Sequence, residues 1–442
     1  MILRKLKPEL GNEEIEMYEK LKGKKLLIVG SAFESEIVKA AHEMGVYVIV
    51  VDNILDRKEA RAKELADAAW DISYFDTDAI VQKCMESGVD GVFAGYGETR
   101  VIAAYRIAKT LGKPFYATEE QINITRDKKR FKEECIRYGV PVPRSYCAGN
   151  IMTGEEKENV IYPVIVKPSD RSGRIGISVC NNRQELDAAI EFALSKSETK
   201  AIVVEEYLEG TEFSAIYTVK NGISSLSCVN AKYITDDQTV PNLLCDCAMA
   251  PAVFVNDFKS KIDSAIADLL NGIGMKNGMA NFQGMVTEKG IFVFETGLRI
   301  NGNNDWKIIE KNNGINFAKM LMAYSLCGDM CDDLSKDTPF FKRYYCTLPF
   351  YAHGGIIAKL EFDKVLAFDW AEISTQNAGV GTEILEDCTG RQKVIAFLIE
   401  ADNYEQLLSR IREVQKNVVV ENEAGISLLF KNFNPNKIAD KL

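Results

Sequence analysis

The segment ANFQGMVTEKGIFVFETGLRINGNN, residues 280–304, carries the most specific structural signal in the sequence. Its tripeptide EKG, residues 288–290, suits a three-residue hairpin loop with glycine in the left-handed conformation. Counting back from this loop places Gln283 opposite Glu295. Side chains directly opposite each other in an antiparallel pair lie about 5 Å apart at Cβ. The oxygens of Gln283 and Glu295 can therefore share one Mg²⁺ ion, whose bonds to oxygen are about 2.1 Å long.

The strand that contains Glu295 also carries a cation. Glu295, Gly297 and Arg299 share one face if this strand stays extended. A carboxylate and a guanidinium on the same face suit a phosphate that is bound to a metal ion. The alternative is an exposed ion pair between Glu295 and Arg299. Phe292 and Phe294 argue against it, because they indicate a strand with one well-buried face.

Two lysines upstream of this hairpin stand where an anion is expected. Lys128 lies near the start of a helix predicted within RDKKRFKEECIRYGVPVP, residues 126–143, and helix N-termini favour anions. Lys167 ends the apolar strand YPVIVKP, residues 162–168, where a charge is costly unless an anion meets it. The alternatives are a solvated basic helix face for Lys128 and, for Lys167, a surface lysine whose charge reaches water.

A flexible loop follows directly after that strand. SDRSGRIGIS, residues 169–178, contains two glycines and three serines, and its amides can wrap phosphate oxygens. Arg171 and Arg174 add positive charge to it. The loop lacks the Walker A pattern G-x-x-x-x-G-K-[ST], so a plain hairpin turn is the alternative.

The next segment, IVVEEYLEGTEF at residues 202–213, suits a nucleoside. Its apolar strand ends in a backbone edge at Glu206 to Leu208, which can offer the N–H and C=O groups that an adenine edge needs. Glu212 stands just beyond and can accept both hydroxyls of a ribose. The alternative is an ordinary acidic turn.

The two ends of the chain predict different layers. KKLLIVG at residues 24–30 and VYVIVVD at residues 46–52 flank a helical pattern, which is typical of a parallel strand–helix–strand unit. The first turn lacks G-x-G-x-x-G, so an α/β layer explains Gly30 and Asp52 better than a dinucleotide site does. Beyond about residue 340, alternating segments flank a helix and predict an α+β domain.

The composition bounds the function. A length of 442 residues suggests about three domains, and the net charge of −10 argues against nucleic-acid and anionic-membrane partners. The two histidines, His42 and His353, nearly exclude a histidine-rich zinc site or a histidine-based triad. Eleven irregularly spaced cysteines indicate reduced thiols. No apolar run approaches the about 20 residues of a membrane helix, so a cytoplasmic protein is expected.

Five of these segments, taken in order and spacing, resemble the ATP-grasp superfamily. They are residues 126–143, 162–168, 169–178, 202–213 and 280–304. They are most similar to its carboxylate–amine ligases, which are related to carbamoyl-phosphate synthase, biotin carboxylase and amino-acid ligases. The resemblance implies a fold of mixed α/β and α+β class. The domains that it implies are an extension over residues 1–22, a Rossmann-like pre-ATP-grasp domain over 23–118, an ATP-grasp domain over 119–340 with a mobile lid lobe at about 145–210, and a C-terminal α+β domain over 341–442.

The resemblance also assigns roles to residues. It implies that Lys128 and Lys167 contact the phosphates of ATP from two lobes. Gln283 and Glu295 would ligate magnesium. Arg299 would steady the transferring phosphate, which makes Lys167 and Arg299 the catalytic residues. The other nucleotide contacts that it implies are Ser169, Ser172, Gly173, Gly176 and Ile177 in a lid formed by residues 169–178, Glu205, Glu206, Tyr207 and Leu208 around adenine, and Glu212 at the ribose.

One position departs from the family pattern. These enzymes usually read Glu-x-Asn-x-Arg on the metal-binding strand, and this chain has Gly297 at the place of the asparagine. Asn301, Asn303 or Asn304 would then substitute, or the second metal site is weakened. The sequence GYGE at residues 95–98 resembles a Gly-Tyr-Gly stretch of biotin carboxylase, which implies that it faces the cleft.

The resemblance implies an ATP-dependent ligase that joins a small-molecule carboxylate to an amine or ammonia through an acyl-phosphate. Mg²⁺ would be its cofactor, with Mn²⁺ as a substitute, and a homodimer is expected by analogy. Two alternatives stay open. One is an enzyme that acts on bicarbonate or a purine precursor, as carboxylases and carbamoyl-phosphate synthases do. The other is a nucleotide-binding module without catalytic activity.

Overall fold

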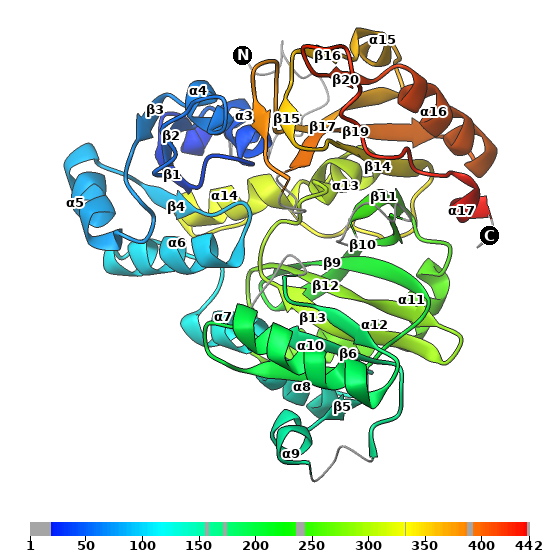
Figure 1. Ribbon diagram of the computed structural model, residues 1–442. Coiled ribbons are helices and arrows are strands. Elements are labelled where there is room, and N and C mark those ends of the chain that lie inside the picture. Colours follow the sequence, from blue (N-terminus) through cyan, green and yellow to red (C-terminus); the bar gives the residue numbers. More distant parts are fainter. Residues whose placement is uncertain are drawn as a thin grey trace.

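The computed structural model describes residues 19–154, 159–170, 175–235, 244–331, 333–386 and 392–439. Most of the expected extension over residues 1–22 lies outside this part of the chain. The described strands form a parallel sheet, a long antiparallel sheet, a smaller antiparallel sheet and two short strand pairs. Figure 1 shows the parallel layer on the left, the C-terminal segments at the upper right and a separate lobe at the bottom.

The N-terminal layer is a four-stranded parallel sheet in the order β3-β2-β1-β4. Four of the five residues of β1 and of β2 are buried, because a parallel sheet is covered on both faces. This explains the two apolar runs of the sequence and confirms the predicted α/β unit. The elements are β1 (Lys25–Val29), α3 (Ser35–Glu43), β2 (Tyr47–Val51), α4 (Arg61–Leu65), β3 (Ala68–Trp70), α5 (Thr77–Ser87), β4 (Gly91–Phe93) and α6 (Glu98–Thr110).

A helix from a distant part of the chain, α14 (Phe317–Cys327), packs against β4 of this layer. The close approach depends on Gly91, because a Cβ atom there would lie 2.4 Å from the carbonyl oxygen of Ser325. The N-terminal layer therefore rests on the middle of the chain.

The main body is an eight-stranded antiparallel sheet in the order β13-β12-β9-β10-β11-β14-β19-β17. Strand β14 pairs with β11, so the sheet continues across residue 340, where a domain boundary is expected. One hydrophobic core serves the N-terminal, middle and C-terminal parts. The strands are β9 (Thr211–Lys220), β10 (Ile223–Ile234), β11 (Cys245–Ala250), β12 (Gly278–Thr287), β13 (Gly290–Gly297), β14 (Tyr344–Tyr351), β17 (Ala371–Gln376) and β19 (Lys393–Ala401).

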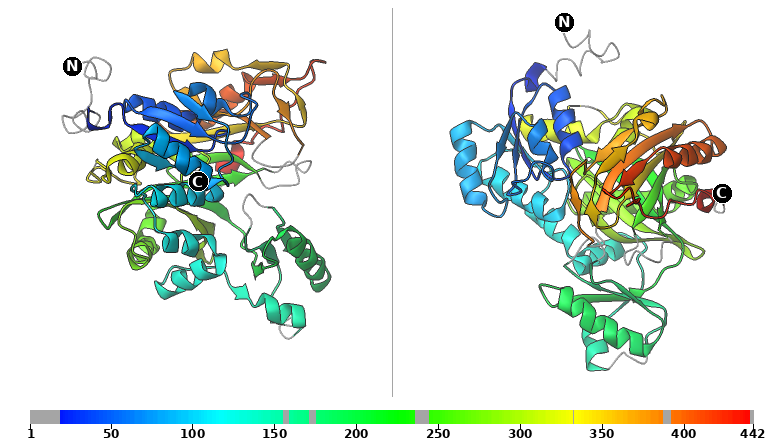
Figure 2. Two further views of the ribbon diagram at one scale, coloured as in Figure 1. Left: turned by 90° about the vertical axis from the view of Figure 1, so that its left-hand side faces the viewer. Right: turned by 45° about the horizontal axis from the view of Figure 1, so that its top comes forward.

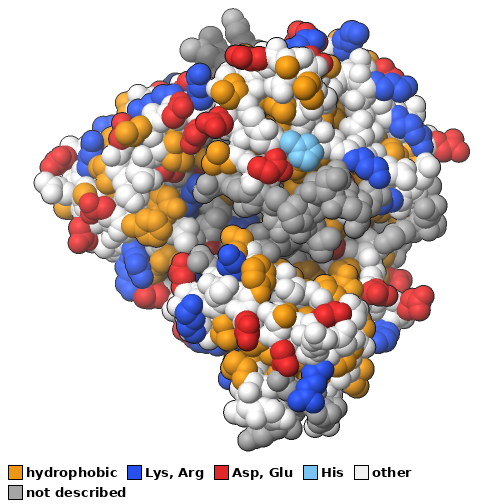
Figure 3. Space-filling view, viewed as in Figure 1, with side chains coloured by type: hydrophobic (Ala, Val, Ile, Leu, Met, Phe, Trp, Pro, Cys, Tyr) orange, Lys and Arg blue, Asp and Glu red, His pale blue; other side chains and the backbone are white. Residues whose placement is uncertain are grey.

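Helices and two short strand pairs complete this body. The helices are α7 (Glu119–Arg126), α8 (Lys128–Arg137), α11 (Val255–Lys261), α12 (Asp263–Gly272), α13 (Asp305–Asn313), α15 (Asp363–Leu366), α16 (Tyr404–Lys416) and α17 (Asn436–Ala439). The strand pairs are β15 (Gly355–Ile356) with β18 (Glu383–Ile384), and β16 (Lys359–Glu361) with β20 (Val419–Glu421). On the face shown in Figure 3, the described acidic and basic side chains are interspersed rather than gathered by sign.

The projecting lobe has a core of its own, separate from that of the body. Its four strands have the order β5-β8-β6-β7, and helix α10 packs on them. Both views of Figure 2 show this lobe extending away from the other layers. Its elements are β5 (Ser145–Tyr146), α9 (Ala148–Thr153), β6 (Val164–Pro168), β7 (Ser178–Cys180), α10 (Arg183–Lys196) and β8 (Ile202–Glu206).

The hairpin of β12 and β13 has a shorter loop than predicted and also contains a β-bulge, and the two differences offset each other in the strand register. Thr287 pairs directly with Gly290, so the loop has two residues rather than three. Gly290 has φ +142°, outside the predicted left-handed helical region. A β-bulge between Gln283 and Gly284 then shifts the register by one residue and restores Gln283 opposite Glu295. The predicted pairing is confirmed, although the predicted loop is wrong.

The buried face of β13 is also formed by other residues than expected. Ile291 and Val293 are buried, whereas Phe292 and Phe294 are half-buried. The bulge interrupts the simple alternation of side chains, and the strand ends at Gly297. Arg299 therefore lies beyond the strand, and it does not simply continue the face of Glu295.

We expect Gly284→Ala to lower the free energy of unfolding by about 2–3 kcal/mol. A Cβ atom at Gly284 would lie 2.1 Å from the carbonyl oxygen of Phe292 and 2.4 Å from Cζ of Phe213. Urea denaturation measures the change. In the control Gly149→Ala, the new Cβ would meet only Cys147 Sγ, at 3.9 Å, so no loss is expected. A Gly284→Ala protein as stable as the wild type would contradict this packing.

Candidate active site

A buried carboxylate lies where the lobe meets the body. Glu205 is 3% exposed and sits on β8 between β5 and β6. Lys167 of β6 approaches it with Nζ at 2.7 Å from Oε2, and Lys132 of α8 contacts Oε1. Burial acts to raise the pKa of Glu205, but the attraction of Lys167 and Lys132 outweighs it and holds this pKa below its usual range. The side chain of Glu205 therefore binds lysines instead of facing a base.

Lys132 was not singled out in the sequence. It follows Lys128 by four residues on α8, so both lie on the same face of the helix. Besides Glu205, it donates to the carbonyl oxygen of Pro143 at 3.0 Å and to Ser145 Oγ at 2.6 Å. This spacing is the signal that could have identified it.

Lys128 connects the body to the loop after β6. Its Nζ donates to the carbonyl oxygen of Ser169 at 3.2 Å. Burial lowers the pKa of Lys128, and the neighbouring charge of Lys167 lowers it further, while Glu295 and Glu205 act in the opposite direction. Lys128, Lys167 and Glu295 come from three separate elements, and their charges act on one another at this place.

Lys167 also contacts β13, the strand that the sequence predicts to bind the metal ion. Its ammonium lies 5.6 Å from the ring centroid of Phe294 on β13, within the range of a cation–π contact. The half-buried face of Phe294 thus receives the lysine of the lobe. This contact brings the predicted phosphate-binding lysine next to the strand that carries Glu295.

Part of the predicted lid lies outside the described residues, including Arg171, Ser172, Gly173 and Arg174. On its near side, Ser169 donates its N–H to the carbonyl oxygen of Ala201 at 3.0 Å. On its far side, Gly176 has φ +76°, and a Cβ there would lie 2.8 Å from Cγ of Pro168. The far end, with Ile177 next in the chain, therefore lies close to the end of β6.

The segment predicted to bind adenine has one amide available. The N–H of Glu206 bonds to the carbonyl of Arg144, and the N–H of Tyr207 bonds to the carbonyl of Pro163. The side chain of Glu206 is also engaged, because it accepts from the N–H of Arg144 at 2.9 Å. Among the described residues, the N–H of Leu208 has no such partner. Of these three N–H groups, that of Leu208 is therefore the one left for the expected contact with adenine.

Lys232 on β10 joins the predicted ribose and metal residues. Its Nζ lies 3.4 Å from Oε1 of Glu212 on β9 and 2.9 Å from Oε1 of Gln283 on β12. Sequence analysis missed Lys232, because its neighbours are 20 and 51 residues away along the chain. The pairing of three adjacent strands alone brings these side chains together.

The donor set of Gln283 and Glu295 fits a magnesium ion. Both side chains carry oxygen and lie opposite each other beside the bulge, where Oε1 of Gln283 also accepts from Lys232. Within the described part of the chain, no three His, Cys, Asp or Glu side chains gather into a metal site. Magnesium is commonly held by one or two carboxylates together with phosphate oxygens, so two protein oxygens are a sufficient start.

Arg299 is engaged by the GYGE segment of the N-terminal layer. Its Nε donates to Oε1 of Glu98 at 2.7 Å. Two of the asparagines considered as substitutes for Gly297 have structural partners. Asn304 accepts from Tyr96 and Trp306 and donates to Ser374, and the Asn301 amide donates to Asp305.

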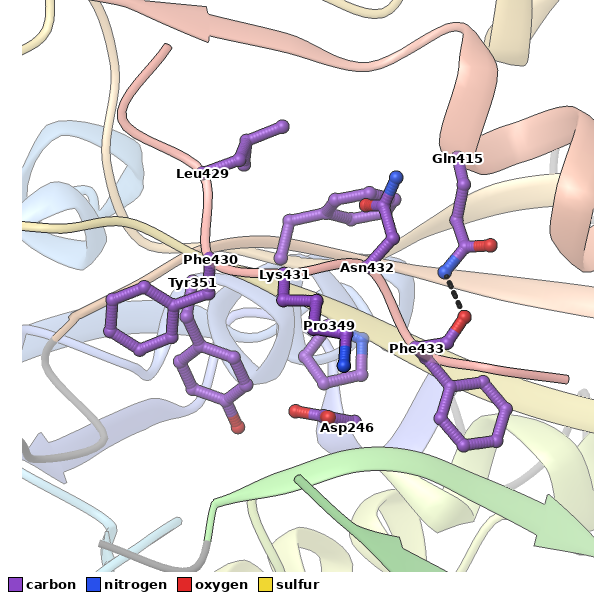
Figure 4. Close-up of a pocket in the computed structure, with 10 residues that line it drawn as sticks. Asp246, Pro349, Tyr351, Gln415, Leu429, Phe430, Lys431, Asn432 and Phe433 are labelled. Carbon is purple, nitrogen blue, oxygen red and sulfur yellow. Dashed lines mark hydrogen bonds between the residues drawn. The ribbon is translucent and has the colours of Figure 1, made fainter. Parts of the chain in front are cut away.

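Two cavities lie outside this constellation. The pocket in Figure 4, between β14 and the C-terminal segment, has a volume of about 20 Å³, which is room for one water molecule. Tyr351 and Phe430 stack across one side of it. A larger pocket of about 250 Å³ lies on the N-terminal layer, lined by Tyr74, Phe75, Thr77, Thr99, Ile102, Ala103, Arg106 and Arg126.

We expect Glu205→Gln to lower the free energy of unfolding at pH 7 by about 3 kcal/mol, because two buried ammonium groups lose their counter-charge. The folded-state pKa of Glu205 lies below its ordinary value of 4.5. The wild-type advantage is therefore complete above pH 4.5 and disappears as the pH falls through the folded-state pKa. Urea unfolding of both proteins at several pH values measures this.

The matched control for this prediction is Glu134→Gln, which breaks a more exposed pair with Arg137 on the same helix. Such a pair contributes at most about 1 kcal/mol. Equal losses in the two variants would contradict the central role of Glu205.

The comparisons with known sequences point to one group of enzymes. Residues 145–239 match the family model of the D-ala D-ala ligase C-terminus. The 2-oxoglutarate carboxylase small subunit of Hydrogenobacter thermophilus is 30% identical over 207 residues, which cover 42% of this chain and 43% of the relative. The carbamoyl phosphate synthase large chain of Clostridium beijerinckii is 25% identical over 312 residues, which cover 65% of this chain and 28% of the relative. The chain thus spans less than half the length of either relative.

None of the described helices combines the length and the apolar character that crossing a membrane would need.

Among solved structures, one similar protein is the biotin carboxylase domain dimer of the Hydrogenobacter thermophilus 2-oxoglutarate carboxylase, in complex with MgADP, ADP and bicarbonate. It has a TM-score of 0.76 at 19% identity, and the match covers 92% of this chain and 91% of that one. An L-amino acid ligase from Bacillus licheniformis has a TM-score of 0.74 at 18% identity and covers 91% and 99%. The chain therefore has the ATP-grasp fold that these solved structures share.

Proposed function

We propose that this protein is an ATP-dependent ligase that joins a carboxylate to an amine or ammonia. The reaction proceeds through an acyl-phosphate and releases ADP and phosphate. The observation that carries the proposal is the meeting of two lysines beside β13: Lys128 Nζ lies 3.2 Å from the carbonyl oxygen of Ser169, and Lys167 Nζ lies 5.6 Å from the ring centroid of Phe294, next to Glu295. One buried and one half-buried ammonium group beside a carboxylate suit a nucleoside triphosphate with its metal ion.

The nucleotide would bind along the edge of the lobe. The N–H of Leu208 suits the adenine edge, and Glu212 with its neighbour Lys232 suits the ribose hydroxyls. Lys128 and Lys167 would hold the phosphates, together with backbone amides at Gly176 and Ile177.

Gln283 and Glu295 would hold Mg²⁺ or Mn²⁺, which supplies charge neutralisation and orientation of the phosphates when bound. The two lysines share this task, since Lys167 is buried, Lys128 is half-buried, and both lie near the strand of Glu295. Low local dielectric strengthens every one of these interactions. The site can therefore offset the charge that spreads over the γ-phosphoryl oxygens during transfer.

In the first step, an oxygen of the substrate carboxylate attacks the γ-phosphorus, and the bond to the β-phosphate oxygen of ATP breaks. In the second step, the amine nitrogen attacks the acyl carbon, loses a proton, and phosphate leaves. Arg299 can stabilise the oxyanion of the tetrahedral intermediate, which exists after the nitrogen has attacked and before phosphate leaves. Closure of the loop at residues 169–178 would exclude water, which otherwise hydrolyses the acyl-phosphate.

A second candidate is a reaction on bicarbonate or a carboxylated purine precursor. The sequence relatives named above, a carbamoyl phosphate synthase and a 2-oxoglutarate carboxylase subunit, favour it. A nucleotide-binding module without turnover is the third reading, and Gly297 in the metal strand is its support. A homodimer is part of the proposal only by analogy with the solved dimeric domain.

We expect Lys167→Ala and Glu295→Ala each to reduce ADP formation at least about 100-fold, since each removes a charge that stabilises phosphoryl transfer. A coupled ADP-release assay measures this. The control Lys109→Ala removes an exposed lysine that pairs with Glu119 on the surface, and it should leave the rate unchanged. Undiminished turnover in either site variant would contradict the assignment.

The same assay distinguishes the three candidate functions when it is run on wild-type protein with panels of amino acids, ammonia and bicarbonate. ADP release that requires one acid and one amine supports the ligase. Release that requires bicarbonate, with or without an acid, supports the second candidate. Nucleotide binding without release on any panel supports the non-catalytic module.

A further inference from the structure

Gly297 leaves a gap in the metal strand that another side chain fills. It stands two residues beyond Glu295, at the end of β13, and carries no side chain of its own. A Cβ atom built at Gly297 would lie 2.7 Å from Oε1 of Glu98. Real Cβ atoms essentially never approach another atom so closely, so the Glu98 carboxylate, the far end of a flexible side chain, would have to shift if residue 297 carried a side chain.

The oxygen of Glu98 lies at about the distance from residue 297 that a side-chain oxygen of that residue would have. From ordinary bond lengths, the oxygen of an asparagine is about 2.4 Å from its own Cβ. The 2.7 Å separation between the built Cβ of Gly297 and Glu98 Oε1 is close to this value. The carboxylate therefore stands beside the position of the missing side chain, although it comes from a residue 199 positions earlier in the chain.

Two contacts hold Glu98 at this place. Its Oε1 accepts from Nε of Arg299 at 2.7 Å. Tyr96, two residues before it, donates its hydroxyl to Oδ1 of Asn304. The start of α6 and the loop before it are thus attached to the segment after β13 at Arg299 and at Asn304.

The second oxygen of Glu98, Oε2, makes no hydrogen bond or ion pair within the described residues. The Glu98 side chain is 22% exposed, so a ligand can reach it. A carboxylate oxygen of this kind suits a hard divalent cation. Glu295 lies about 6.6 Å along the strand from the Gly297 position, which allows two cations to be held side by side on the phosphates.

We propose that Glu98 supplies, from the N-terminal layer, the oxygen ligand for a second divalent cation that the metal strand lacks at Gly297. This inference rests on the proposed function, because the second cation binds together with the nucleotide. It makes the metal site a joint product of two layers of the fold. The site then gains one negative charge relative to a neutral amide ligand.

The test counts Mn²⁺ ions bound to the full chain in the presence of a non-hydrolysable ATP analogue, by electron paramagnetic resonance. We expect two Mn²⁺ for the wild type. Glu98→Ala should bind the second Mn²⁺ at least about tenfold more weakly. Gly297→Ala should also weaken binding of the second Mn²⁺ while keeping the carboxylate, because its new methyl group forces the Glu98 side chain to shift.

The double variant Gly297→Asn/Glu98→Ala should recover the second Mn²⁺, because the asparagine has room once the carboxylate is gone. Gly297→Asn alone should not recover it. The matched control Glu36→Ala breaks another ion pair of the N-terminal layer, the one that joins Glu36 to Lys307 at 2.5 Å. Its Mn²⁺ count should equal that of the wild type.

The outcomes separate this inference from the proposed function. Two Mn²⁺ with wild-type affinity in Glu98→Ala, or a single Mn²⁺ in the wild type, would overturn the role of Glu98 and leave ATP binding standing. Absence of nucleotide-dependent Mn²⁺ binding in the wild type would overturn both. Circular dichroism of each variant confirms folding, and recovery in the double variant is a result that a merely structural ion pair does not produce.

Discussion

The structure depends on burying the carboxylate of Glu205 between two ammonium groups. A buried charge is costly unless it is paired and hydrogen-bonded, and Lys132 and Lys167 meet this requirement from α8 and β6. The pairing holds the lobe against the body. Since Lys128 shares the helix face of Lys132, the same contact brings Lys128 to the loop after β6. One ion cluster therefore positions the residues proposed to bind phosphate.

The long antiparallel sheet provides the opposite wall of the site. Adjacent strands β10, β9 and β12 place Lys232, Glu212 and Gln283 side by side, and β13 adds Glu295 at its edge. The N-terminal layer reaches the same edge through Glu98. Because this sheet continues through β14 into the C-terminal part, three parts of the chain share one framework around the site.

The charge of the protein is distributed in a way that its net value does not reveal. The chain carries −10 overall, yet the positive groups proposed for phosphate binding are gathered inside, between the lobe and the body. Lysines, an arginine and oxygen ligands meet the electrostatic needs of phosphoryl transfer without histidine. The scarcity of histidine thus agrees with the proposed chemistry.

Local sequence patterns were enough to predict the parallel N-terminal unit, the hairpin of β12 and β13, and the pairing of Gln283 with Glu295. The predicted hairpin loop was one residue too long, and the pairing is correct only because the bulge at Gly284 restores the register. The tertiary structure alone decided the roles of Lys132, Lys232 and Glu98, whose partners stand 73, 51 and 201 residues away. Periodicity and turn chemistry act over a few residues, whereas strand order and the packing of separate layers decide which distant charges meet.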